Sequence, residues 1–196
     1  FDPNHISITD ASITASLNIL KDDTLDVSLK KMSLREASGI TISNGRLKLR
    51  KDSKGTFHIN DFLISLLGTS VQSDHIVFHP GGNGAKPYGE GNIKASITPS
   101  NIKAFYEPLQ EVDDVIDIDI SAYYRDSIVT VSKLNIDDSE KALRVAGTGT
   151  VRNIGTSSQV IDARIDELEI NSNIEHAIWP MLDRIITGGN PTDVVK

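Results

Sequence analysis

Apolar and polar residues alternate with a period of two through most of the chain. From Ile116 to Tyr124, apolar side chains occupy every second position, with Asp117, Asp119 and Ser121 between them. Successive side chains of a β-strand point to opposite faces, so this period gives each strand one apolar face and one polar face. Strands of this kind are typical of an antiparallel sheet, whereas parallel strands buried on both faces are apolar throughout.

The phase of this alternation slips at several points through an apolar step of three. Val131 is followed by Leu134. In the same way, Ile165 is followed by Leu168. A β-bulge or a tight turn at each slip would return the apolar side chains to one face. If the slips are bulges, the strands are long and bent, and the sheet that they form is curved.

Two stretches carry helical signals instead. Thr98 can cap a short helix that we expect near 99–108, which begins with a proline at its first position. Ser172 and Glu175 have the spacing of a capping box for a second helix near 173–186. The sequence therefore predicts a mainly β fold: a curved antiparallel amphipathic sheet, either trough-like or an open sandwich, with two short capped helices.

Turn signals divide the chain further. The sequence "SNGR" at 43–46 lies between two short apolar runs and predicts a hairpin, and "KDSKG" at 51–55 predicts another turn. Residues 81–92 are rich in glycine, which predicts a loop or linker. We expect this linker to separate a first amphipathic β segment, 1–80, from a second β segment, 93–196, that includes both helices.

Composition excludes several functional classes. The 196 residues include 20 Lys and Arg against 27 Asp and Glu, a net charge of -7, and an acidic chain gains nothing from counterion release on nucleic acid. The absence of cysteine excludes disulfides, thiolate zinc sites and cysteine nucleophiles. The longest apolar run, 62–67, is much shorter than a membrane span. Because the chain begins with Phe1, we expect it to be a fragment of a longer protein.

The residues that could carry chemistry do not form a recognisable site. His75 and His79 lie four apart in an expected strand, a spacing that suits two metal ligands on a helix and not on a strand. Acidic stretches at 113–120 and 136–140 leave calcium binding as an alternative, but they lack the loop of an EF-hand, and solvated strand faces explain them. We therefore predict no catalytic residue, metal site or cofactor, and no enzymatic activity.

Several phrases of the sequence resemble a known family. "MSLREASGITISN", from Met32 to Asn44, is similar to a phrase found between two strands in AsmA/TamB-like envelope proteins of diderm bacteria. Residues 57–78 resemble a later strand of that family, and residues 143–171 resemble its G-x-G strand, loop and following strand. The resemblance extends over roughly residues 24–185, although the glycine-rich loop is longer here.

This resemblance implies a segment of a very long protein on the periplasmic side of the cell envelope, anchored in the inner membrane by a part of the parent protein absent from this sequence. Such proteins form a curved, trough-like sheet with an apolar concave face. They are implicated in phospholipid transport between membranes and in outer-membrane protein assembly. The implied partners are therefore phospholipid acyl chains and the outer-membrane assembly machinery, without nucleic acid.

This resemblance makes the apolar residues of the strands the candidate functional residues. An open apolar face needs a lipid or a lid to cover it. The alternative is a closed β-sandwich, an adhesion or assembly module without a ligand groove, in which these faces bury one another. The candidate lipid-facing residues are Leu25, Val27, Leu29, Ile116, Ile118, Ile120, Val129 and Val131.

Overall fold

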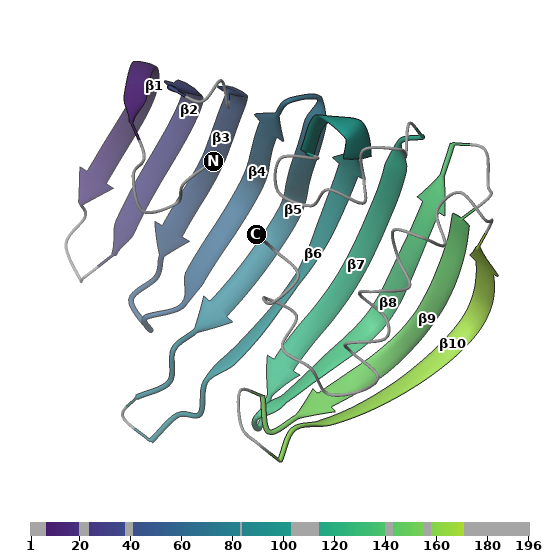
Figure 1. The fold of residues 1–196 in the computed structure, drawn as a ribbon. Helices are drawn as coiled ribbons and strands as arrows, with labels where there is room; N and C mark the ends of the chain where they lie inside the picture. The colour runs from purple at the N-terminus through teal and green to yellow at the C-terminus, as the bar shows by residue number, and fades with distance from the viewer. Residues whose placement is uncertain are drawn as a thin grey trace.

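A computed structural model shows a single open sheet of ten antiparallel strands, which pair in the order in which they follow one another along the chain (Figure 1). The structure describes residues 7–19, 24–37, 41–82, 84–102, 114–139, 143–154 and 158–170. The strands are β1 (Ile8–Ile19), β2 (Leu25–Glu36), β3 (Thr41–Lys51), β4 (Phe57–Leu66), β5 (Thr69–His79), β6 (Tyr88–Ile97), β7 (Ile116–Arg125), β8 (Ile128–Asp138), β9 (Leu143–Arg152) and β10 (Val160–Ile170). The predicted mainly β, antiparallel fold is therefore confirmed.

The sheet is one layer. Figure 1 shows the strands side by side, with β1 and β10 at opposite edges and with a pronounced bend toward the β10 side. Among the described residues of the strands, only Val77 and Leu143 are buried apolar side chains. Leu143 packs with partly buried neighbours at one end of the sheet, including Ile116 and Ile170. The described strands thus lack the shared core that two stacked sheets of a sandwich would enclose.

The phase slips of the sequence are β-bulges. The step from Val131 to Leu134 lies inside β8, where the pairing with β9 shifts register. The step from Ile165 to Leu168 lies inside β10, where Asp166 is the extra residue against β9. Neither slip is a turn, because each strand continues on both sides. The prediction of long, bent strands in a curved sheet is confirmed (Figure 1).

The structure shows only the beginning of the first predicted helix and does not describe the second. Of the first, the structure describes a short 3-10 helix, η1 (Pro99–Ile102), and the remainder to residue 108 lies outside the described residues. The Thr98 hydroxyl donates a hydrogen bond to the Gly68 carbonyl at 3.3 Å, so it ties η1 to the β4–β5 turn. The second helix, 173–186, also lies outside the described residues. No helix in the described part of the chain is long and apolar enough to cross a membrane.

The hairpin predicted at 43–46 is wrong, because β3 runs straight through these residues. Gly45 pairs with Met32 of β2, and a Cβ at Gly45 would lie 2.8 Å from the Met32 Cε. The glycine therefore permits a close approach inside a strand and does not make a turn. The turn predicted at 51–55 is correct. It joins β3 to β4, and Gly55 there has a φ of 82°, a conformation that favours glycine.

The glycine-rich range 81–92 is only partly a loop. Strand β6 begins at Tyr88, so Gly89 and Gly91 lie inside the sheet. A Cβ would lie 3.1 Å from the Val77 carbonyl oxygen at Gly89, and 3.0 Å from the Ile76 Cγ1 at Gly91. These glycines are again sites of close approach between strands. The hairpin between β5 and β6 leaves the sheet continuous across the boundary expected between 1–80 and 93–196.

Ion pairs gather on the polar face and link neighbouring strands. They include Lys48–Asp61 at 2.5 Å, Lys133–Asp119 at 2.7 Å and Arg144–Glu167 at 2.7 Å, together with Arg152–Asp162. Exposed pairs of this kind each contribute little to stability. Together, the charged side chains of these pairs keep the polar face of the sheet in contact with solvent.

We predict that Gly149→Val destabilises the fold. A Cβ at Gly149 of β9 would lie 2.8 Å from the backbone oxygen of Asp162 in β10, and backbone cannot move aside without disturbing the pairing. Overpacking of this kind costs about 1–3 kcal/mol, which urea unfolding followed by circular dichroism will measure. Thr148→Val, on the polar face of the same strand, is the control and should have a small effect. Equal unfolding midpoints for the two variants would contradict the prediction.

Candidate apolar binding face

One row of paired residues crosses the whole sheet, and every member is apolar or glycine. Directly paired residues of adjacent strands point to the same face, so the registers of the nine strand pairs can be followed from edge to edge. The row, which we call the transverse row, runs from β1 to β10 through Leu17, Val27, Leu49, Ile59, Ile76, Gly91, Ala122, Val131, Gly149 and Ala163.

All eight candidate residues lie on the face that contains the transverse row. Val27 and Val131 are members of the row itself. The other six alternate in phase with the row members of their strands: Leu25 and Leu29 in β2, Ile116, Ile118 and Ile120 in β7, and Val129 in β8. The structure thus brings β2, β7 and β8, which are far apart in sequence, onto one continuous surface, which we call the apolar face.

No described strand packs against the apolar face. Large apolar side chains on it are exposed from one edge to the other: 62% of Ile13 in β1, 43% of Ile93 in β6 and 59% of Ile165 in β10. A soluble monomer seldom leaves contiguous apolar patches of more than a few hundred Å² in water, and larger ones mark interaction sites. The apolar face is therefore the candidate functional site.

A hollow of about 420 Å³ interrupts the apolar face over β5 to β8, and apolar atoms line almost all of it. Gly89, Gly91 and Ala122 line it as its smallest residues. Larger side chains border them on the same face: Phe78 of β5, Ile93 of β6, Ile120 and Tyr124 of β7, and Val129 of β8. Two of the candidate residues, Ile120 and Val129, thus belong to this hollow, while Leu25, Val27 and Leu29 lie several strands away.

Sequence reasoning missed Gly89 and Gly91 because it placed both in a loop. Yet the period of two extends back through them from Ile93, with Glu90 and Asn92 at the alternate positions. A glycine that keeps the phase of the flanking apolar residues is the signal that could have found them. It marks a place where the apolar face lacks a side chain, and here that place is the floor of the hollow.

Three of the aspartates in the acidic stretches of β7 and β8 lie on the polar face, whereas Asp138 pairs with Ile116 and is buried. Asp117, Asp119 and Asp137 line a second hollow of about 310 Å³ together with Lys94. The Lys133 Nζ lies 2.7 Å from an Asp119 carboxylate oxygen. Carboxylates paired with lysines on a solvated face are not a preformed cation site. No group of three or more potential metal ligands is present in the described residues.

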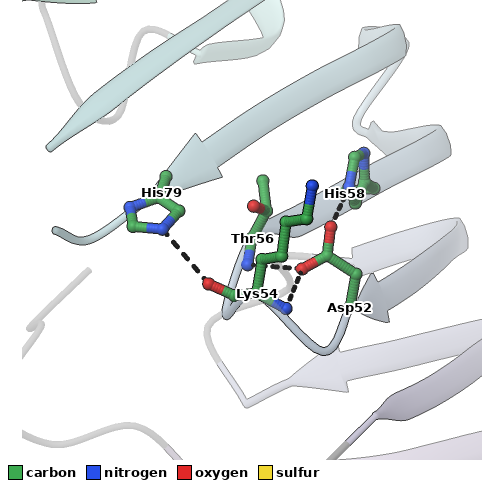
Figure 2. A network of polar contacts seen from close by, with 5 residues as sticks. All are labelled: Asp52, Lys54, Thr56, His58 and His79. Atoms are coloured by element: carbon green, nitrogen blue, oxygen red, sulfur yellow. Dashed lines mark hydrogen bonds and ion pairs between the residues drawn. The ribbon is translucent and has the colours of Figure 1, made fainter. Parts of the chain in front are cut away.

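A network of polar contacts at the β3–β4 turn includes two of the histidines (Figure 2). The Asp52 Oδ1 accepts hydrogen bonds from the backbone N–H groups of Lys54 at 2.9 Å and Thr56 at 3.0 Å. The other Asp52 carboxylate oxygen lies 3.4 Å from the His58 Nε2. Across the gap to β5, the His79 Nε2 lies 3.2 Å from the Lys54 carbonyl oxygen. The network therefore joins the turn to strands β4 and β5.

Both ring nitrogens of His79 take part in this structural role. The Gly81 N–H donates to Nδ1 at 2.9 Å, which leaves Nε2 as the protonated nitrogen that donates to the Lys54 carbonyl. The ring also stacks on Tyr88, with centroids 5.2 Å apart. His75 is engaged elsewhere, with its Nδ1 at 2.9 Å from the Asn60 Oδ1. His75 and His79 are thus placed as anchors of adjacent strands and turns and do not converge on a common centre.

The turn network changes the acidity of Asp52. The hydrogen bond from the Thr56 N–H, with those from His58 and Lys54, holds the pKa of the Asp52 carboxyl below its ordinary value of 3.8, although burial opposes this effect. The carboxylate is the stable form, so it acts as a fixed acceptor for the turn. A group with a lowered pKa is a poor proton donor near neutral pH, which argues for a structural role.

Comparisons of the sequence with protein-family models and with curated proteins, and of the fold with solved structures, found no match. The functional argument therefore rests on the geometry of the sheet and on the phrases described above.

We predict that Asp52→Ala lowers stability at neutral pH and has less effect in acid. A carboxyl whose pKa is lowered in the folded state adds stability above its ordinary pKa, and this is lost as the pH falls through the folded-state value. The gap in urea midpoint between the parent chain and Asp52→Ala should therefore narrow below about pH 3.8. The urea midpoint of Asp52→Asn, which keeps one acceptor oxygen, should lie between those of the unsubstituted chain and Asp52→Ala. A gap that does not change with pH would refute this role.

Proposed function

We propose that this chain is a segment of an AsmA/TamB-like protein and that its apolar face carries phospholipid acyl chains on the periplasmic side of a diderm cell envelope. The observation that carries the proposal is the transverse row from Leu17 to Ala163, which makes one apolar surface of ten strands without a covering layer among the described residues. The resemblance of residues 24–185 to that family supports the same assignment.

The energetics favour a lipid on this surface. Apolar surface left in water costs roughly 25 cal/mol per Å², and each methylene group of an acyl chain that leaves water contributes about 0.8 kcal/mol. An acyl chain on the apolar face removes both surfaces from water at once. The charged polar face stays in solvent on the other side of the sheet, where Lys133–Asp119 and similar pairs lie.

The proposed mechanism is passive and needs no chemical step. The apolar face has shallow relief: large side chains such as Phe78 and Tyr124 border the hollow, and glycines lie within it. An acyl chain can lie against this relief without entering an enclosed cavity, so it can also slide to neighbouring strands. Acyl chains would then move along the sheet while their headgroups remain in water. In this proposal the protein is not an enzyme, and a membrane-anchored parent protein supplies the connection to the outer-membrane assembly machinery.

We predict that phospholipid co-purifies with the chain. Native purification followed by organic extraction and mass spectrometry should give bound phospholipid in stoichiometric amount. Ile120→Asp places a carboxylate in the hollow without a partner, and burial of such a group against an acyl chain should reduce the bound lipid by about tenfold or more. Circular dichroism establishes that the variant keeps its strands. A lipid-free extract from the folded, unsubstituted chain would contradict the proposal.

We also predict that filling the hollow weakens lipid binding. Ala122 lies on the apolar face in the transverse row, whereas Ala146 of β9 lies on the polar face, between Asn135 and Glu167. Ala122→Leu should lower the affinity for a fluorescent fatty acid by about tenfold, which corresponds to about 1.4 kcal/mol and lies within the cost of about 1–3 kcal/mol for overpacking. Ala146→Leu adds the same volume on the other face and should bind like the parent chain. Equal affinities of the two variants for the fatty acid would show that acyl chains do not bind at the hollow.

A further inference from the structure

Strand β1 forms an edge of the sheet, and its outer side pairs with no strand in the described ranges. Every one of its 12 residues is exposed. Because an edge strand presents a row of backbone N–H and C=O groups, it is a template for another strand. The backbone thus determines the kind of partner that fits this edge, namely a further β-strand added to the sheet.

The two edges of the sheet differ in how they are protected against such pairing. Strand β10 carries four carboxylates and one arginine, and a bulge interrupts it between Ile165 and Glu167. Charges and bulges are the usual means by which proteins block an edge. Strand β1 has neither lysine nor proline, and its one charged residue, Asp10, and its one bulge, between Ile8 and Asp10, both lie at its N-terminal end, outside residues 11–19. The β1 edge is therefore open to pairing and the β10 edge is guarded.

Strand β1 is also complementary to itself. Residues 11–19 alternate without interruption, since the register shift against β2 within this range, between Thr14 and Ala15, comes from an extra β2 residue, Lys30. An antiparallel pair of β1 strands centred on Ala15 places like beside like and opposes no charges. The resulting neighbours are Ile13 with Leu17 and Ala11 with Ile19 on the apolar face, and Thr14 with Ser16 and Ser12 with Asn18 on the polar face.

We propose that β1 pairs with β1 of a second copy of this chain, antiparallel, about a two-fold axis that is normal to the sheet and passes between the two Ala15 residues. Rotation about this axis turns the second sheet within its own plane, so the apolar faces of both copies lie on the same side. The dimer is closed, because a guarded β10 edge remains at each end. Pairing of β1 with β10 would instead be head-to-tail, which leads to open fibres.

Single cysteine variants test this register, because the chain contains no cysteine. Ala15 and Ala163 are matched positions: each is an alanine of the apolar face in the middle of an edge strand. Mild oxidation of Ala15→Cys should yield a disulfide-linked dimer of twice 21.3 kDa on a non-reducing gel, since the two thiols meet at the axis. Ala163→Cys should run as a monomer on the same gel, because its thiols lie at the unpaired β10 edges of the dimer. Monomeric Ala15→Cys, or equal cross-linking of both variants, would overturn the proposal.

Sedimentation equilibrium tests the same edge without a covalent link. The parent chain should show a concentration-dependent dimer. The double variant Ser12→Lys with Asn18→Lys places like charges opposite each other at two places across the axis, while within each chain the two lysines lie opposite Ser33 and Asp26 of β2, and it should sediment as a monomer. A parent chain that is monomeric at every concentration refutes the pairing. A double variant that dimerises as well as the parent shows contact through another surface, such as the apolar face, and refutes it equally.

Discussion

The antiparallel hydrogen-bond ladder between strands that follow one another along the chain is the interaction on which this structure depends. Each strand pairs with the next from β1 to β10, and no described layer crosses over them. Within the ten described strands, only Val77 and Leu143 are apolar residues that become buried. Stability therefore comes from nearest-neighbour terms, as in repeat proteins, and includes the half-buried contacts between apolar side chains of adjacent strands.

A single layer with one apolar side has direct consequences for function. The charged side is solvated, while the apolar face stays in need of a partner because no opposing layer covers it in the described residues. The proposed acyl-chain role and the proposed pairing at β1 answer two different needs of the same sheet: the first covers its face, and the second completes its ladder at an edge. The pairing at β1 leaves the hollow around Gly89 and Gly91 accessible to an acyl chain.

Glycine is the residue type on which sequence reasoning about this fold succeeded least. At Gly55 it serves a turn through a positive φ, and the turn was predicted correctly. At Gly45 and Gly91 it serves a strand, because a Cβ would collide with Met32 or Ile76 on the neighbouring strand. The two uses look alike in a sequence, since the second depends on which residue lies opposite. The prediction of the first helix depended similarly on a local capping signal, and the Thr98 hydroxyl donates instead to the Gly68 carbonyl in a turn distant in sequence.

The sequence by itself determined that the strands are one-sided and that they belong to an antiparallel sheet, because these features follow from side-chain alternation within one strand. It left each phase slip as either a bulge or a turn, and the structure decided for bulges. The sequence also determined which of two faces each candidate residue occupies within its own strand. Only the tertiary structure decided that β2, β7 and β8 share one uncovered surface and that a hollow lies beside Ile120. The reason is register: the transverse row depends on extra residues such as Lys30 and Ser132, which set what lies opposite what, and alternation along a single strand carries no information about its neighbour.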